Sequence, residues 1–283
     1  MDKSDIKYSV LMSVYCKEKS EYLEYSIKSM LNQTIMPNEF VIVKDGKLTK
    51  ELEEILDKYK TLYPEIFKLI SLEKNLGLGL ALKVGVENCS NELIARMDSD
   101  DYSFPTRIQK QLEKFNSDKE LDIIGTNVKE FQDDINNVIS LVKLPELNDE
   151  IYKFSKKRCP FRHPSIMLKK SFIMKIGNYR EFYLCEDYDL YVRLIRKNAK
   201  CYNIQEELVC MRINKDFYKR RGGIKYLSSI MKFKNEQLNL KYFTVGEYIK
   251  TVVPHIIVCL MPNTFRDFVY RNLLRKNYKG EKV

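Results

Sequence analysis

The amino-acid sequence predicts an α/β protein with a mostly parallel central sheet, followed by a helical, basic C-terminal extension. In the first half of the chain, short apolar runs alternate with segments of helical periodicity, the order that gives parallel strands joined by crossover helices. Polar residues follow directly after several of these runs, where parallel sheets bind ligands. With 283 residues, of which 44% are hydrophobic, the chain can bury a large core and is not disordered.

The positive charge lies at the end of the chain. The net charge is +10, from 49 Lys and Arg against 39 Asp and Glu. Residues 219–283 hold 14 of the basic residues and 4 of the acids, so residues 1–218 are neutral, with 35 of each sign. A nucleic-acid-binding module would leave the acidic clusters of this neutral part unexplained. We therefore expect no nucleic-acid partner.

The first half divides into regular elements. An apolar run at 8–14 predicts a buried strand, and the spacing of Leu23, Ile27, Met30 and Leu31 predicts a helix. Further expected elements are a strand at 40–45, a charged helix at 48–60, a strand at 67–71, a helix after 77–79 and a strand at 92–98.

The second half is less regular. Helices are expected at 105–117, 147–157 and 186–197, and strands at 121–131, 137–142, 164–168 and 207–213. A boundary at Lys219–Gly223 separates a main domain, 1–218, from a helical, basic tail, 219–283.

Cysteines and apolar runs bear on the cellular compartment. The seven cysteines are scattered and include no CxxC pair, which disfavours a disulfide framework and a zinc site and fits a reduced cytosolic protein. The longest apolar stretch, Val252–Pro262, is far shorter than the roughly 20 residues of a spanning helix. We expect no transmembrane segment.

The strongest chemical signal is Met97-Asp98-Ser99-Asp100-Asp101, placed directly after an expected strand. Three carboxylates this close repel one another unless a cation neutralises them, and oxygen ligands suit Mg²⁺ or Mn²⁺ held together with substrate phosphates. The alternative is an acidic loop that caps the helix after Pro105, through Asp101 or Ser103. The residues alone leave both readings open.

A second signal, Cys185-Glu186-Asp187-Tyr188-Asp189-Leu190, lies where a loop enters a helix. There Asp187 can project into a cleft as a general base, although acids at a helix start also simply favour the helix dipole. A third signal is Phe161-Arg162-His163-Pro164-Ser165, in which Pro164 biases His163 towards an extended conformation. A lone histidine is more often structural than catalytic.

Other motifs are weak or missing. Gly77-Leu78-Gly79 has the start of a dinucleotide fingerprint, but Leu82 replaces its third glycine. The sequence has no GxxxxGK[ST], HExxH or GxSxG, which disfavours P-loop NTPases, zinc proteases and α/β-hydrolases.

Seven motifs occur in a characteristic order between about residues 8 and 213. They are Val14-Tyr15 with Glu18; Gln33-Thr34 with Pro37 and Glu39; Val43-Lys44-Asp45-Gly46; Asn75-Leu76-Gly77; Arg96-Met97-Asp98-Ser99-Asp100-Asp101; His163-Pro164-Ser165; and Glu186-Asp187-Tyr188-Asp189-Leu190. In this order they resemble family-2 glycosyltransferases, specifically the bacterial enzymes that build capsule or O-antigen polysaccharide.

The resemblance implies a GT-A nucleotide-sugar-binding fold and an inverting transfer. The main domain would then be catalytic, with a donor-binding part at about 1–131 and an acceptor part at about 132–218. By analogy, Asp187 is the general base with Glu186 beside it, and Asp98 and Asp100 hold the metal. The implied donor-binding residues are Val14, Tyr15, Glu18, Asp45, Asn75, Gly77, Lys83, Arg96 and Asp98, and the implied acceptor-side residues are His163, Asp101 and Arg193. Lys83 departs from the family, where many relatives have Asn.

The resemblance also implies substrates. The donor would be a UDP-sugar, with galactose or glucose transferred, and the cofactor Mn²⁺ or Mg²⁺. The acceptor would be an undecaprenyl-diphosphate-linked saccharide, with N-acetylglucosamine and a β-1,3 bond as our specific expectation. A nucleotidyltransferase that makes nucleotide-sugars is the alternative, but it would normally have a Gly/Arg/Lys-rich loop after the first strand, where Tyr15-Cys16-Lys17-Glu18 stands.

The residues of the C-terminal tail indicate where the protein would encounter its acceptor. After Pro262, Phe265, Phe268, Val269 and Leu273 share one face of an expected helix, and Arg266, Arg271, Arg275 and Lys276 occupy the rest. A basic amphipathic helix favours an anionic membrane surface. We therefore expect a cytoplasmic enzyme, peripheral at the inner face of the cell membrane. The alternative is a helix packed on the catalytic domain.

Overall fold

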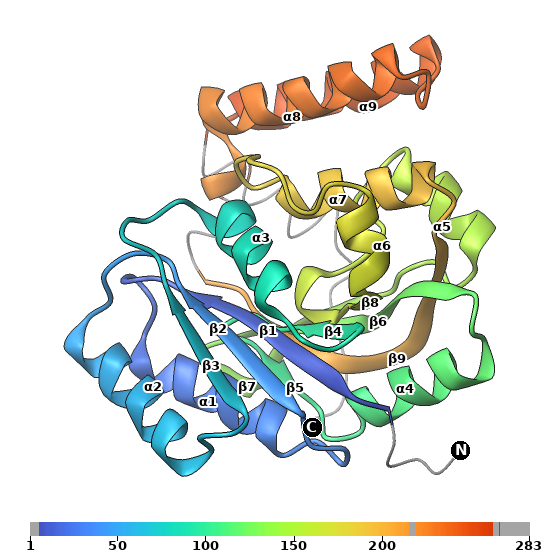
Figure 1. The fold of residues 1–283 in the computed structure, drawn as a ribbon. Coiled ribbons are helices and arrows are strands. Elements are labelled where there is room, and N and C mark those ends of the chain that lie inside the picture. The colour runs from blue at the N-terminus through green and yellow to red at the C-terminus, as the bar shows by residue number, and fades with distance from the viewer. Residues whose placement is uncertain (1–5, 215–218, 263–265, 267–283) are drawn as a thin grey trace.

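The computed structural model describes residues 6–214, 219–262 and 266, which form one nine-stranded mixed sheet covered by helices (Figure 1). The strands are β1 (Tyr8–Val14), β2 (Glu39–Lys44), β3 (Phe67–Ser71), β4 (Leu93–Arg96), β5 (Tyr102–Ser103), β6 (Leu121–Gln132), β7 (Asp134–Val142), β8 (Met167–Lys169) and β9 (Lys200–Arg212). The helices are α1 (Ser20–Leu31), α2 (Lys50–Leu62), α3 (Leu78–Asn88), α4 (Arg107–Ser117), α5 (Asn148–Ser155), α6 (Lys170–Lys175), α7 (Glu186–Arg196), α8 (Gly223–Asn239) and α9 (Val245–Leu260), with short 3₁₀ turns η1 (His163–Ser165) and η2 (Lys219–Arg221).

The strand order is β3-β2-β1-β4-β8-β6-β9-β5, and β7 pairs with β6. The half of the sheet formed by β3, β2, β1 and β4 is entirely parallel, and β6 also runs parallel to β9. Antiparallel pairs join β8 to β4 and to β6, β5 to β9 and β7 to β6. This architecture confirms the expected α/β class.

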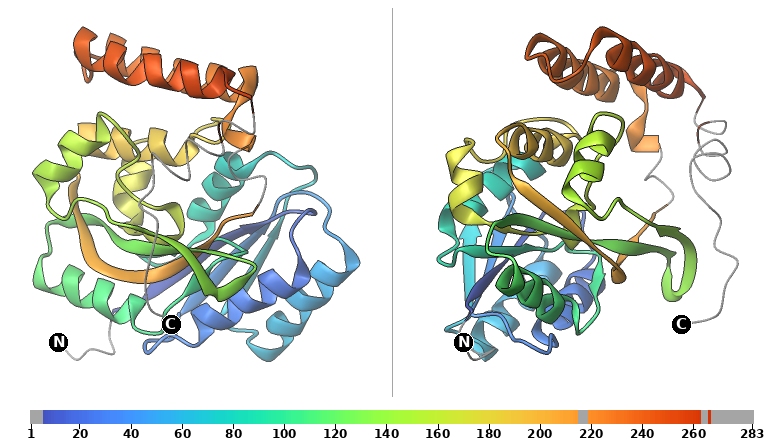
Figure 2. Two further views of the ribbon diagram at one scale, coloured as in Figure 1. Left: turned by 180° about the vertical axis from the view of Figure 1, so that it is seen from behind. Right: turned by 90° about the vertical axis from the view of Figure 1, so that its right-hand side faces the viewer.

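Two helical layers sandwich the sheet, and Figure 2 shows the arrangement from behind and from the side. Along β1, Val10 and Met12 pack with α1, α2 and α4, whereas Leu11 packs with α3 and α7. Successive strand residues point to opposite faces, so a strand with helices on both sides is mostly apolar. This requirement explains the run at 8–14, in which only Ser9 and Ser13 are polar.

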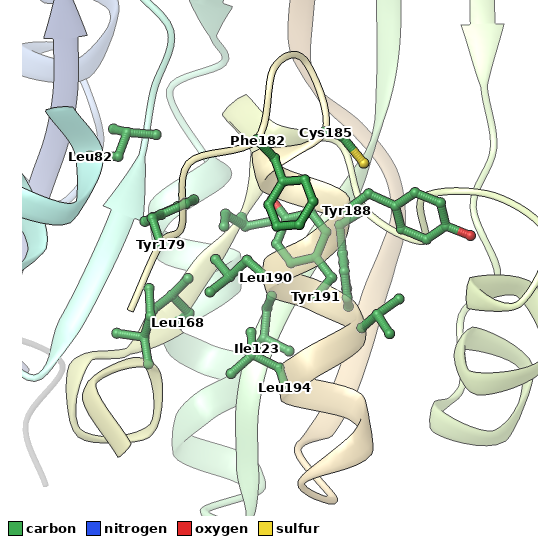
Figure 3. Packing of buried hydrophobic residues seen from close by; sticks show 14 of the residues in the cluster. Leu82, Ile123, Leu168, Tyr179, Phe182, Cys185, Tyr188, Leu190, Tyr191 and Leu194 are labelled. Carbon is green, nitrogen blue, oxygen red and sulfur yellow. The ribbon is translucent and has the colours of Figure 1, made fainter. Parts of the chain in front are cut away.

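The core beneath α7 supports the end of the sheet where the candidate site lies. Tyr188, Leu190, Tyr191 and Leu194 of this helix are buried against β6 and β8 (Figure 3). Rigid packing here fixes the start of α7, the segment that carries the predicted base.

The C-terminal helices α8 and α9 pack against each other and on the rest of the fold. Tyr226 and Phe233 of α8 join the same buried cluster as Tyr188, and the two aromatic rings of Tyr188 and Phe233 lie 4.6 Å apart. The segments beyond Pro262 lie outside the described residues, apart from Arg266. None of the helices in the described residues is long and apolar enough to cross a membrane.

The structure corrects the expectation for Arg266, which was placed on an outward basic face. The Arg266 side chain is buried and donates hydrogen bonds to the carbonyl oxygens of Val258, Cys259 and Met261, at 2.9, 2.9 and 2.6 Å. These carbonyls end α9, where a cation satisfies unpaired acceptors and opposes the helix dipole.

Several elements also differ from expectation. Residues 164–168 were expected to form one strand, but η1 occupies His163–Ser165 and β8 begins only at Met167. Ser165 stabilises the turn, because its backbone N–H and its hydroxyl both donate to the carbonyl of Arg162. Strand β9 begins at Lys200, seven residues before the expected start, and α6 and β5 were not expected.

Candidate active site

A cleft of ≈ 950 Å³ opens beyond the carboxyl ends of β1, β2 and β4. Its lining comes from the turn after β1, the ends of β2 and β4, the start of α3, the loop into α7, the end of β9 and the start of α8. Crossover connections bring these strand ends together, which is why ligand sites of parallel sheets form there.

Most of the residues predicted for the site meet in this cleft. Those lining it are Tyr15, Glu18, Asp45, Asn75, Gly77, Asp98, Asp100, Asp101, His163, Glu186 and Asp187. Segments as distant in sequence as residues 15 and 187 therefore share one cavity.

Four predicted site residues do not line the cleft. Val14 is buried in the core, and Arg96 lies below the cleft, 1% exposed, paired with Asp98. The Lys83 side chain is exposed on α3. Arg193 is buried and binds Oδ2 of Asp189 at 2.9 Å and two backbone carbonyls. Its role here is to hold the loop before α7.

Asp45 anchors the loop that leads into α3. Its Oδ1 accepts a hydrogen bond from the Leu76 N–H at 2.7 Å, and its Oδ2 accepts one from the Gly77 N–H at 3.0 Å. The next residue, Gly46, has φ +86°, and a Cβ there would lie 2.7 Å from the backbone nitrogen of Asn75. The strand end and the loop can approach this closely only with glycine at position 46.

The acidic loop after β4 forms a crowded cluster. Burial, with the charges of Asp98 and Glu18, raises the pKa of Asp100 to about 7. Burial also raises the pKa of Asp101, whose Oδ1 accepts a hydrogen bond from the Arg212 N–H at 2.7 Å. This contact excludes the capping alternative: Asp101 binds β9, and α4 begins after Thr106 with no side-chain cap.

The cluster fits a divalent ion only in part. Between residues 6 and 214 and across 219–262, no three His, Cys, Asp or Glu side chains are arranged to hold a metal by themselves. Asp98 and Asp100 supply hard carboxylate oxygens beside Glu18, and Mg²⁺ is commonly held by one or two carboxylates plus substrate phosphates. The donor set is therefore suited to an ion that arrives with a diphosphate.

The carboxylate pair at the start of α7 faces the same cleft. Burial raises the pKa of Asp187, and burial with the neighbouring Asp187 charge raises the pKa of Glu186 to about 8. Oδ1 of Asp187 accepts a hydrogen bond from the Tyr188 N–H at 2.7 Å. One of the two carboxyls thus carries a proton near neutral pH, and the other can accept one.

The start of α3 reaches this pair because residue 79 is glycine. A Cβ on Gly79 would lie 2.7 Å from the carbonyl oxygen of Arg180 and 3.1 Å from Cβ of Glu186. Helix α3 therefore packs directly on the segment that carries the carboxylate pair.

His163 contributes to the wall of the cleft. Its Nε2 lies 2.8 Å from the hydroxyl of Tyr179, and burial lowers the pKa of the imidazole, which keeps the ring neutral. The expectation of an extended His163 was wrong, since the residue opens the 3₁₀ turn η1.

Several cleft residues were not found from the sequence. Arg212 stacks over the ring of Tyr22 at 3.8 Å and donates from Nε to the Asp100 carbonyl at 3.0 Å. Its position at the end of an expected strand was the available signal. Arg220 and Arg221 enter the cleft from the C-terminal segment, and no local pattern indicates this fold-back.

The cleft, lined by the acids after β4 and by a buried carboxylate pair, defines a glycosyltransferase of the GT-A type. The mannosyltransferase PcManGT from Pyrobaculum calidifontis, solved with GDP-Man and Mn²⁺, superposes with a TM-score of 0.63 at 10% identity over 94% of this chain and 73% of that one. Residues 1–349 of S. aureus TarS, solved with UDP-GlcNAc, superpose with a TM-score of 0.61 at 16% identity over 95% of this chain and 73% of that one. Both show the shared fold.

The chain belongs to glycosyl transferase family 2, whose family model matches residues 9–177. It is 36% identical over 270 residues to the Escherichia coli UDP-Gal:alpha-D-GlcNAc-diphosphoundecaprenol beta-1,3-galactosyltransferase, covering 95% of this chain and 97% of that one. It is 34% identical over 273 residues to the amylovoran biosynthesis glycosyltransferase AmsE of Erwinia amylovora, covering 96% and 100%.

Proposed function

We propose that the protein transfers galactose from UDP-galactose to N-acetylglucosamine linked through a diphosphate to undecaprenol. The bond formed is β-1,3 and belongs to the assembly of a surface polysaccharide. The proposal depends mainly on one observation: the buried carboxylate of Asp187 lines the same cleft as the acidic cluster after β4. Near-full-length similarity to the E. coli galactosyltransferase supports the choice of donor and acceptor.

Asp187 is the general base of this reaction. Its carboxylate takes the proton from the acceptor hydroxyl, the hydroxyl oxygen attacks the anomeric carbon, and the bond to the UDP oxygen breaks on the opposite face. The configuration at carbon 1 therefore inverts. Burial strengthens the base by raising its pKa, and such help is typically worth ~10²–10⁴ in rate. Glu186, with a pKa of about 8, is mostly protonated at neutral pH and can donate a hydrogen bond to the acceptor.

The donor occupies the side of the cleft formed by β1, β2 and α3. Tyr15 and Glu18 lie in the turn after β1, and Asp45 and Asn75 in the two loops that Gly46 brings together. We assign uracil and ribose to this side, because it offers carboxylate and amide groups next to an aromatic ring. Asp45 acts partly through the loop, since both of its carboxylate oxygens already bind backbone amides.

Asp98 and Asp100 would hold Mn²⁺ or Mg²⁺. When bound, the ion neutralises charge that accumulates on the leaving diphosphate. Its carboxylate ligands must be ionised, so metal affinity should increase as the pH rises past the Asp100 pKa of about 7.

The outer face of α9 supports peripheral membrane binding. Aliphatic side chains recur there every three or four residues and remain exposed, by 64% for Val245 and 63% for Leu260. The residues between them on this face are Ile249, Val253 and Ile257. An apolar helix face in a basic segment is suited to lie in the interface of an anionic membrane, where a lipid-linked acceptor is held.

The testing experiment is a panel of UDP-sugars with a synthetic lipid-diphosphate N-acetylglucosamine acceptor, with Mn²⁺ or Mg²⁺ and with a chelator. UDP release coupled to a β-1,3-linked galactoside, and suppressed by the chelator, is the expected result. Transfer of a different sugar would overturn the donor assignment. Formation of UTP and a sugar 1-phosphate when inorganic diphosphate is added to the UDP-sugar, without release of UDP, would indicate a nucleotidyltransferase.

A further inference from the structure

A second hollow adjoins the active-site cleft on its α8 side. It has a volume of ≈ 480 Å³ and lies between α8 and the loop that leads into α7. Glu181, Phe182, Tyr183 and Lys225 line both the hollow and the cleft, so the two are continuous around this loop. Figure 1 shows α8 lying over the loop and α7.

One face of α8 forms a wall of the hollow. Lys225, Ser228, Ser229 and Lys232 all line it, a spacing of three and four residues that places them on the same side of a helix. Two helical turns, about 10.5 Å, separate the two lysine backbones. Both side chains are exposed and flexible enough to converge on one anion.

The lysines face aromatic rings. The Lys225 ammonium lies 4.2 Å from the ring centroid of Tyr183, and that of Lys232 lies 5.0 Å from the ring centroid of Phe182. In the part of the chain that the structure describes, neither ammonium has a carboxylate within ion-pair distance.

Two of the other charged residues of the hollow, Arg180 and Glu236, already form an ion pair. Arg180 binds Asp189 and, from Nη2, both oxygens of Glu236 at 2.9 and 3.0 Å. Arg180 is therefore already paired with acids, whereas the positive charges of Lys225 and Lys232 remain available to a ligand. Glu181 is the remaining acid of the hollow.

We propose that Lys225 and Lys232 form a subsite for the diphosphate of the lipid-linked acceptor, and that its lipid chain leaves the enzyme along this hollow. The inference rests on the proposed function. A sugar whose C3 hydroxyl reaches Asp187 carries its diphosphate on C1 of the same pyranose ring, two carbons away. The acids after β4 repel that diphosphate, whereas the α8 wall attracts it.

The test compares two acceptors with UDP-galactose as donor. One is N-acetylglucosamine α-linked through a diphosphate to a short alkyl chain, and the other carries the same chain without the diphosphate. The variants are Lys225→Ala, Lys232→Ala and their combination, with Lys225→Arg as the conservative exchange. Lys197→Ala, at an exposed lysine after α7, is the matched control.

Each alanine variant should raise KM for the diphosphate acceptor about tenfold, the loss expected for one charge-assisted contact of about 1.4 kcal/mol. KM for UDP-galactose and for the neutral acceptor should stay unchanged, as should every constant of Lys197→Ala. An alkyl diphosphate without sugar should inhibit the wild-type enzyme but not the double variant, a readout that needs no turnover of the neutral acceptor.

Equal effects on both acceptors, or none on either, would overturn the subsite. A raised KM for UDP-galactose would instead assign the lysines to the donor. In a further outcome, the wild-type enzyme uses neither acceptor and only hydrolyses UDP-galactose slowly. That result would overturn both the proposed acceptor and the subsite. Wild-type transfer with unaffected variants would overturn the subsite alone.

Discussion

The Sγ atom of Cys159 lies 3.7 Å from Oδ2 of Asp187, close enough for the thiol to donate a weak hydrogen bond to the proposed base. Burial raises the pKa of Cys159 well above its usual range, so the thiol keeps its proton. Sγ also lies 3.4 Å from the carbonyl oxygen of Phe161, which holds the side chain between the two acceptors. Cys159 is thus a positioning residue for Asp187.

Cys159→Ala should shift the pH dependence of transfer. A donor to the carboxylate favours its charged form, so removal of the thiol raises the pKa of Asp187. The acid limb of kcat against pH should move to higher pH, and kcat at pH 7 should fall a few-fold. Cys159→Ser restores a donor and should return the limb towards its wild-type position. Identical profiles for the alanine variant and the wild type would show that the contact has no effect on the base.

Glu186→Gln should stabilise the metal-free protein at alkaline pH. The folded-state pKa of Glu186 is about 8, above the usual value of 4.5. Between these values the native state binds more protons than the unfolded state, so the Glu186 contribution to stability falls as the pH rises. The glutamine variant lacks this titration. At pH 8 its Tm should exceed the wild-type Tm by at least about 2 °C, with little difference at pH 4. An equal Tm difference at both values would contradict the assigned pKa.

Asp45→Ala should destabilise the protein by about 1–3 kcal/mol, because it leaves the N–H groups of Leu76 and Gly77 without their acceptor. UDP should also bind more weakly, since the loop into α3 loses its anchor. Urea unfolding and calorimetric titration with UDP measure the two effects. Asp57→Ala, at an exposed acid on α2, is the control and should change neither. Weaker UDP binding at unchanged stability would instead indicate that Asp45 serves the nucleotide alone.

Charge on the outer face of α9 should abolish membrane binding. Val253 and Ile257 are about half exposed, at 48% and 51%, so the double change Val253→Glu, Ile257→Glu should leave folding intact. Sedimentation with vesicles rich in anionic phospholipid should recover the wild type with the lipid and leave the variant in solution. Leu62→Glu, at a 60% exposed leucine on α2, should bind like the wild type. Full binding by the double variant would exclude this face as the contact.

The sequence predicts best where one physical constraint acts alone. The strand at 8–14 was predicted to the residue, and the strand expected near 67–71 was also found, because both segments are rich in apolar residues. The start of β9 was missed, since Gln205, Glu206 and Glu207 interrupt its apolar pattern where the strand shifts register against β6.

The positions of the site residues, too, were predicted correctly where a single physical constraint decides them. Acids at strand ends could be placed because parallel topology brings those ends together. Arg193 was assigned to the acceptor, although its spacing of four residues from Asp189 on a helix already indicates the pair that the structure contains. Arg220, Arg221 and Lys225 could not be found, because their place depends on how the C-terminal segment folds back over the cleft.

The proposed mechanism is tested most directly by Asp187→Asn. The amide keeps the shape of the side chain but cannot accept the acceptor's proton. The variant should bind UDP with wild-type affinity in calorimetric titration, while kcat for galactose transfer to the lipid-diphosphate acceptor falls by at least about 10²-fold. Glu186→Gln, which retains Asp187, should lose far less activity. Wild-type transfer by Asp187→Asn would contradict the assignment of Asp187 as the base.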